Sequence, residues 1–135
     1  MTPYQINSAV NSFLATNWTA TNILKENTTD APSLPFIAVY FRPGSVEGIE
    51  INGATIRHGV FMIDIWTPKG VGIDEGLVYG GLLETLFHHK SIVATGGRII
   101  CENSFMQPYT SALGIDAAMQ AYHTQTVIPF GVITE

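Results

Sequence analysis

The stretch RHGVFMIDIWTPKGVGIDEGLVYGGLLETLFHH, residues 57–89, carries the strongest strand signal and the strongest helix signal of the chain. In its first part every second residue is apolar and the residues between are mixed: Phe61, Ile63 and Ile65 alternate with Met62, Asp64 and Trp66. A period of two is typical of a strand that packs one face on a core. We therefore predict a long strand here, ended by Pro68.

The second part of the stretch predicts a helix that covers this strand. Gly70 and Gly72 suit a turn, and Asp74 and Glu75 place negative charge in the first helical turn, where the helix dipole favours it. Large apolar residues then follow at helical spacing: Leu77, Val78, Leu82, Leu83, Leu86 and Phe87. We expect this stripe to face the sheet.

A glycine-flanked turn between a strand and a helix also raises the question of phosphate binding, but the spacing excludes the known motifs. A Walker loop requires Gly-Lys-Ser/Thr at the helix start, whereas Lys69 precedes the glycines. The dinucleotide-binding fingerprint requires a third glycine where Glu75 stands, and the charge of Glu75 would repel pyrophosphate. We therefore interpret the turn as structural and expect no cofactor.

Length and composition limit the class of protein. With 135 residues the chain fits one domain, residues 1–135. Only 13% of the residues are charged while 46% are hydrophobic, so we expect another subunit to cover part of the surface. The net charge of −5, with six basic residues, argues against nucleic-acid binding, which needs a positive surface.

Other sequence features predict a cytoplasmic protein that does not enter a membrane. A single cysteine, Cys101, allows no internal disulfide and suits a reducing compartment, where we expect it to be a buried strand residue. Met1 is not followed by the basic and then apolar segments of a signal peptide. No run of about 18 apolar residues is present to span a membrane.

Before residue 57 we predict a helix, a connection and two strands. Thr2 and Pro3 suit a helix start, and the helix has an apolar stripe of Ile6, Val10, Phe13 and Leu14 opposite Asn7, Ser8, Asn11 and Ser12. Residues 17–35 form a long connection anchored by Trp18, Ile23 and Leu24. The apolar run 36–41 predicts a buried strand that ends at residues 42–44. Residues 46–51 and the residues from 54 onward flank Asn52-Gly53, a type I′ turn signal that predicts antiparallel pairing.

After the second helix we predict two further strands and an irregular arm. Gly96 and Gly97 break the chain, residues 98–102 resume extended structure, and the last strand covers about 117–130, with Pro129 at its edge or end. Residues 103–116 are too apolar for a solvated linker and too irregular for a regular element. We expect this arm to pack against a partner through Phe105, Met106 and Tyr109.

Two glycines inside the second helix, Gly80 and Gly81, are a further interface candidate. Each costs about 1 kcal/mol relative to alanine, so a close neighbour should compensate. That neighbour is either the sheet beneath the helix or an adjacent subunit.

The histidines and Asp64 are the remaining candidates for chemistry. His88 and His89 are adjacent, which is the wrong spacing for two metal ligands on one helix face. His58 and His123 each lie in a strand and could meet across the sheet, but no cluster of further ligands supports a metal site. No partner at a recognisable spacing accompanies Asp64, so we interpret it as a hydrogen-bonded or interface residue and predict no catalytic site.

Three segments, taken in order, resemble a known family. They are residues 34–40 (LPFIAVY), residues 57–60 (RHGV) through 68–72 (PKGVG), and residues 127–130 (VIPF). Together with the two helices they resemble the tail terminator proteins of long-tailed bacteriophages, of the minor tail protein U type, and related small phage domains of uncharacterised function. Residues 103–116 depart from the pattern, because relatives vary widely there.

The resemblance implies a mixed, mainly antiparallel sheet flanked by two main helices, an α+β fold, in a ring of six subunits without catalysis. Such a ring would be assembled in the host cytoplasm and would cap the tail tube in the virion tail. Its partners would be its own copies, the tail tube protein and head–tail connector proteins. Two other classes stay open: a head–tail connector of another type, and a small enzyme or ligand-binding domain that uses the sheet face around Asp64 and His123.

Overall fold

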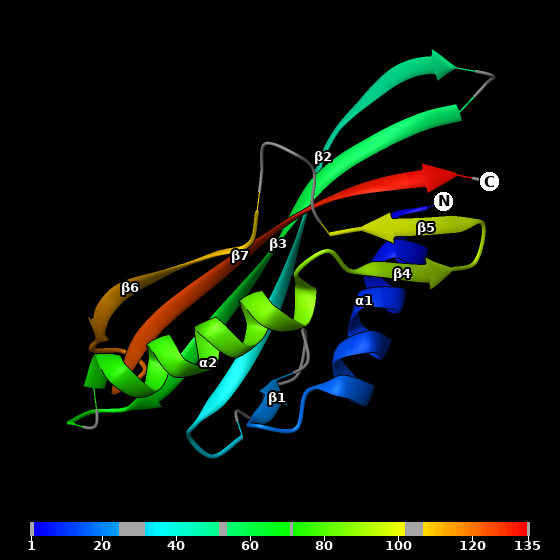
Figure 1. Cartoon of the computed structure of the whole chain (residues 1–135). Helices are drawn as coiled ribbons and strands as arrows, with labels where there is room; N and C mark the ends of the chain where they lie inside the picture. Colours follow the sequence, from blue (N-terminus) through cyan, green and yellow to red (C-terminus); the bar gives the residue numbers. More distant parts are fainter. Residues whose placement is uncertain (1, 25–31, 52–53, 71, 102–106, 135) are drawn as a thin grey trace.

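The structure is a computed structural model that describes residues 2–24, 32–51, 54–70, 72–101 and 107–134. Within these residues the chain forms two helices and seven strands (Figure 1). In chain order they are α1 (Pro3–Asn17), β1 (Asn22–Leu24), β2 (Phe36–Ile51), β3 (Ala54–Pro68), α2 (Gly72–Phe87), β4 (Ser91–Ala94), β5 (Gly97–Ile100), β6 (Tyr109–Asp116) and β7 (Ala121–Thr134).

The described strands form one sheet in the order β1-β2-β3-β7-β5-β4, with β6 also paired to β7. Only β1 and β2 are parallel, and every other pair is antiparallel. The first half of β7 pairs with β6 and its end pairs with β5, so β6 and the β4–β5 hairpin lie on the same side of β7. The predicted α+β class with a mixed, mainly antiparallel sheet is therefore confirmed.

Both helices cover the same face of the sheet (Figure 1). The main core lies between the helices and that face. The predicted alternation in β3 is confirmed, because Phe61, Ile63 and Ile65 are fully buried. They form one cluster with the α1 residues Ile6, Val10 and Leu14 and the α2 residues Leu83 and Phe87. Among the described residues, no helix covers the opposite face of the sheet.

The start of α1 follows the prediction from Thr2 and Pro3. The Thr2 hydroxyl accepts a hydrogen bond from the Gln5 N–H at 3.2 Å, and the Gln5 side chain accepts one from the Thr2 N–H at 2.8 Å. This reciprocal capping box satisfies amide groups that the helix start leaves unpaired. Trp18, the predicted anchor of the following connection, is also buried.

The packing face of α2 differs from the prediction. Leu83 and Phe87 are buried, but Leu77, Val78 and Leu82 are 42%, 61% and 47% exposed. The residues that continue the buried stripe toward the helix start are two glycines, Gly76 and Gly80. A Cβ on Gly76 would overlap the Thr124 hydroxyl of β7, and one on Gly80 would lie 2.7 Å from the Thr110 hydroxyl of β6. The helix therefore lies directly on the sheet through its glycines, which turns Leu77, Val78 and Leu82 of the predicted stripe outward.

Two prolines occur inside strands that were predicted to end near them. β2 continues through Pro43 to Ile51, whereas the sequence predicted an end at residues 42–44. β1 pairs with β2 only as far as Ala38, so Pro43 lies where one side of β2 has no described partner, which is where strands tolerate proline. Pro129 lies inside β7, between the stretch paired with β6 and the stretch paired with β5.

The other differences concern short or exposed strands. The connection 17–35 contains β1, and β4 precedes the predicted break at Gly96. The last strand covers 121–134 rather than 117–130. Part of the predicted irregular arm forms β6, whose residues are mostly exposed on both faces and so show no apolar period. The Asn52-Gly53 turn lies outside the described residues, but Ile51 and Ala54 pair antiparallel on either side of it as predicted.

Candidate functional site

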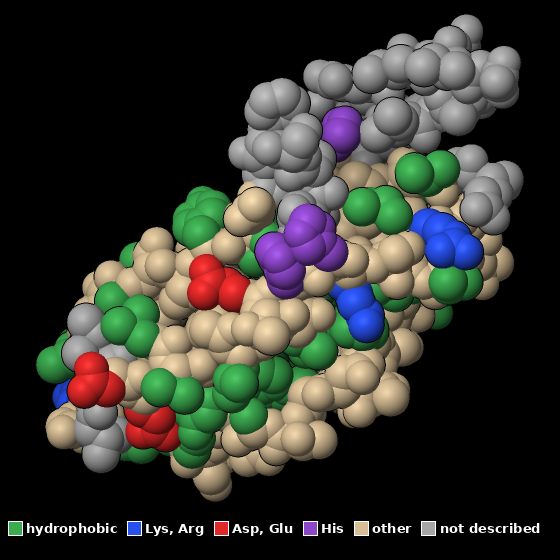
Figure 2. Space-filling model, in the orientation of Figure 1, with side chains coloured by type: hydrophobic (Ala, Val, Ile, Leu, Met, Phe, Trp, Pro, Cys, Tyr) green, Lys and Arg blue, Asp and Glu red, His purple; other side chains and the backbone are tan. Residues whose placement is uncertain are grey.

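The outward face of α2 is an apolar surface that the rest of the described chain leaves uncovered. Leu77, Val78 and Leu82 lie on it, and a Cβ on Gly81 would meet nothing within 4 Å. Figure 2 shows hydrophobic side chains around this helix, with a few acidic side chains between them. Isolated exposed apolar residues are common, but a group on one helix face is typical of a contact surface.

Next to α2, the edge strand β6 adds three more exposed apolar side chains. Tyr109, Leu113 and Ile115 are 54%, 53% and 66% exposed. β6 pairs only with β7 among the described strands, so its outer edge presents unpaired backbone groups. We call Leu77, Val78, Leu82, Leu113 and Ile115 the α2–β6 surface. Tyr109 is not part of it, because Thr110 faces α2 and the side chain of Tyr109 therefore lies on the opposite face of the sheet.

The residues predicted to form an interface have different places in the structure. Tyr109 is 54% exposed on the sheet face opposite α2, and Gly81 lies on the outward side of α2, where a Cβ would meet nothing within 4 Å. Gly80 instead packs against Thr110 of its own chain, which identifies the sheet as the neighbour that this glycine meets. Phe105 and Met106 lie outside the described residues.

A polar cluster lies on the sheet face that carries no helix. The register of β3 and β7 places Trp66 opposite His123 and Asp64 opposite Gln125. One oxygen of Asp64, Oδ1, is 2.9 Å from both His123 Nε2 and the Gln125 amide nitrogen, and the Trp66 ring stacks on the His123 ring at 4.1 Å. Asp64 is thus a hydrogen-bonded residue as predicted, although its partners lie 59 and 61 residues away in sequence.

The contact that His58 and His123 could have made across the sheet is not formed. His58 pairs with Gly131 and His123 with Trp66, eight positions along β3 from each other, so the two histidines do not meet. The sequence places each histidine in a strand but does not say which residues of the two strands pair. The observed pairing separates the two histidines. Among the residues that the structure describes, no three His, Cys, Asp or Glu side chains come together as metal ligands do.

Burial also restricts the chemistry of the single cysteine. Cys101 is fully buried just after β5, as expected of a small core residue. Desolvation raises the pKa of its thiol to about 12, so it carries almost no thiolate at neutral pH and is a poor nucleophile. In the described part of the chain, neither helix is long and apolar enough to cross a membrane.

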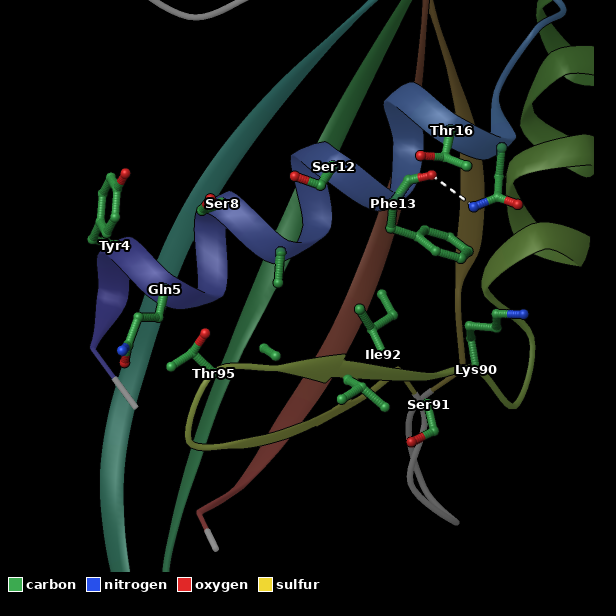
Figure 3. Close-up of a pocket in the computed structure, with 14 residues that line it drawn as sticks. Tyr4, Gln5, Ser8, Ser12, Phe13, Thr16, Lys90, Ser91, Ile92 and Thr95 are labelled. Atoms are coloured by element: carbon green, nitrogen blue, oxygen red, sulfur yellow. Dashed lines mark hydrogen bonds between the residues drawn. The ribbon is translucent and has the colours of Figure 1, made fainter.

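A groove that the sequence did not predict lies between α1 and β4. Its volume is about 830 Å³, and Figure 3 shows α1 running along one side and β4 along the other. Ser8, Ser12 and Thr16 line the α1 side. From the sequence, Ser8 and Ser12 were predicted only to lie on the polar face of a helix, because no local signal shows that a later strand runs beside that helix.

Comparison with known proteins supports the fold and goes no further. No family model matches the chain, and no curated protein matches it at a significant level. A solved structure of a protein known only by a sequence identifier is similar, with a TM-score of 0.66 and 19% sequence identity. The similarity covers 100% of this chain and 96% of that chain. At this identity the likeness shows a shared fold alone.

Proposed function

We propose that this protein is a structural protein of bacteriophage tail assembly, which forms a ring of six subunits that caps the tail tube and joins the tail to the head. The observation that carries the proposal is the α2–β6 surface. Its five large apolar side chains are between 42% and 66% exposed in the isolated chain. Burial of such side chains against a partner drives stable association.

The geometry of the α2–β6 surface suits a ring because it combines a helix face with an open strand edge. A head-to-tail contact joins two different surfaces, and it closes into a ring when the rotation between subunits allows it. The free edge of β6 can also add backbone hydrogen bonds to the apolar contact. Assembly of this kind needs no catalytic group.

Sedimentation at rising protein concentration, with and without tail tubes, tests the ring. We expect a species of several subunits, in solution or on contact with tubes, and expect Leu82→Glu to prevent it because a charge would then have to be buried. Val93→Glu is the matched control, since Val93 is 72% exposed on β4, outside the α2–β6 surface. A strictly monomeric wild-type protein in both settings would refute the ring.

A deletion phage separates a terminator from a head–tail connector of another type. A terminator stops tube growth, so its loss should give overlong tails. Tails of normal length that do not join heads would favour the connector.

The second candidate is a ligand-binding or enzymatic domain, and the Asp64–His123 pair favours it. Both side chains are partly accessible, with 13% and 18% exposure, on the sheet face that carries no helix. A small molecule that raises the melting temperature of the wild type, but not of His123→Ala, would support this candidate. Equal shifts in both proteins would count against it.

A further inference from the structure

The sheet face that carries no helix has an apolar row that crosses four strands. The strand registers place one residue from each strand side by side in this row: Tyr40 (β2), Met62 (β3), Val127 (β7) and Tyr109 (β6). The buried residues next to them in sequence, among them Phe61 and Ile63, face the helices. Because side chains alternate along a strand, the four residues of the row face the other way. We call Tyr40, Met62, Val127 and Tyr109 the sheet-face row.

The sheet-face row is accessible from solvent. Tyr109 is 54% exposed, and Tyr40, Met62 and Val127 are partly exposed. Among the described residues, no helix covers this side of the sheet. A sheet face that stays in water normally carries polar residues, and tyrosine and methionine are side chains that protein interfaces favour. The row is therefore typical of a surface that a partner covers.

An exposed positive charge borders the sheet-face row. Arg42 lies two residues after Tyr40, on the same face of β2, and its guanidinium carbon is 6.0 Å from the centre of the Tyr40 ring. The Arg42 side chain donates one hydrogen bond, to the carbonyl oxygen of Phe41 at 3.4 Å. No carboxylate of the described residues forms an ion pair with it. An acidic partner surface would supply the missing carboxylate.

The outward face of α2 has the matching chemistry. Every charged residue of α2 is acidic: Asp74, Glu75 and Glu84. Asp74 is exposed and lies one helical turn before Leu77 and Val78, so a carboxylate borders the apolar side chains of the α2–β6 surface. An apolar surface with an acidic border can thus cover an apolar row with a basic border.

The two surfaces lie on opposite sides of the sheet, as a head-to-tail contact requires. α2 lies on the side of the main core, whereas the sheet-face row lies on the side without a helix (Figure 1). Each copy can therefore offer one surface to each of two neighbours. Contacts of this kind close into a ring when the rotation between copies allows it.

We propose that the α2–β6 surface of one copy packs on the sheet-face row of the next copy, with Arg42 facing the acidic residues of α2. This inference rests on the proposed assembly function and names the second surface of the ring contact. The α2 helix of the next copy then covers the sheet face that has no helix of its own. Each sheet is thus packed between helices on both faces, an arrangement that buries apolar residues on both sides.

Two matched tyrosine variants of the full-length protein test the sheet-face row. Tyr109→Glu should prevent the assembly that the wild type shows in sedimentation, in solution or on tail tubes, because a charge would then have to be buried. Tyr4→Glu is the control, since Tyr4 is 79% exposed on α1, outside both surfaces, and should assemble like the wild type. Both variants should melt near the wild-type temperature, because both side chains are exposed.

The outcomes separate this inference from the ring itself. Normal assembly of Tyr109→Glu, together with its loss in Leu82→Glu, would overturn the sheet-face row and leave the ring standing. Equal loss in Tyr109→Glu and Tyr4→Glu would also overturn the row. A wild type that stays monomeric in both settings would overturn the ring and this contact together.

A mixture of two variants that form no ring shows which surfaces meet. Leu82→Glu keeps the sheet-face row and Tyr109→Glu keeps the α2–β6 surface, so the mixture can form one contact and no ring. In NMR, the amide signals of labelled Leu82→Glu around Met62 and Val127 should shift when unlabelled Tyr109→Glu is added. Unlabelled Leu82→Glu should cause no shift. Shifts confined to other residues, or none at about 1 mM, would overturn the pairing.

The same mixture tests the charge contact. Arg42→Gln in the labelled variant should weaken the association about twofold to fivefold, the range of an exposed ion pair. Lys90→Gln is the matched control, because Lys90 is exposed outside both surfaces and should leave the association unchanged. Equal association of the two glutamine variants would overturn the role of Arg42.

Discussion

The two adjacent glycines of α2 should respond in opposite ways to the same substitution. Gly80→Ala and Gly81→Ala each remove a helical glycine, which by itself stabilises a helix by about 0.8–1.0 kcal/mol. At Gly81 the new methyl group meets nothing within 4 Å, so this gain should appear in full. At Gly80 it would lie 2.7 Å from the Thr110 hydroxyl and overlap the Thr110 methyl group, and such overpacking costs about 1–3 kcal/mol.

The difference between the two variants is therefore about 1–3 kcal/mol, with Gly81→Ala the more stable. For 135 residues, an unfolding entropy of about 2.1 cal/mol/K per residue converts each kcal/mol into about 3.5 °C. Calorimetry should thus show Gly81→Ala melting about 4 to 10 °C above Gly80→Ala, and above the wild type. Urea unfolding of the same three proteins gives the free energies directly.

A double-mutant cycle with Thr110→Ala locates the cause. Thr110→Ala alone loses the hydrogen bond between the Thr110 and Thr126 hydroxyls, 2.9 Å apart, at a cost of about 0.5–1.5 kcal/mol. In the Gly80→Ala background it also relieves the overlap, so the two substitutions should couple favourably by about 1 kcal/mol or more. Equal melting of the two alanine variants, or the absence of coupling, would refute the placement of α2 on β6.

Three further predictions concern other parts of the chain. Tyr109→Ser should leave the melting temperature nearly unchanged, because its side chain is 54% exposed, but abolish tail completion in a complementation assay; a variant that unfolds would show that Tyr109 belongs to the core. Asp64→Ala should lower the free energy of unfolding in urea by about 1–2 kcal/mol, because it leaves the donors of His123 and Gln125 without their acceptor, and unchanged stability would contradict this. Burial raises the pKa of the Cys101 thiol to about 12, so as the pH rises this thiol ionises in the unfolded chain before it ionises in the folded protein. The stability that the neutral thiol contributes is therefore complete below about pH 9 and falls as the pH rises toward 12. Cys101→Ala should flatten this part of the pH profile of urea unfolding, and an unaltered slope would show that other groups cause it.

The sequence alone determined the elements whose signals are local. Thr2, Pro3 and the stripe of α1 predicted that helix, since a cap and an apolar period act within a few residues. The alternation in β3 predicted which of its faces is buried. Residues 46–51 and 54 onward were predicted to pair antiparallel because a two-residue connection leaves the two strands no other arrangement.

The tertiary structure alone decided which surfaces remain exposed and which polar groups meet. Leu77 and Val78 face outward because Thr110 and Thr124, far along the chain, accept only glycines beneath α2. Asp64 and His123 meet because β3 and β7 pair in one register. The α1–β4 groove exists because a helix near the start of the chain runs beside a later strand edge. Each of these arrangements depends on contacts between residues far apart in sequence, and no local period, cap or turn motif records such contacts.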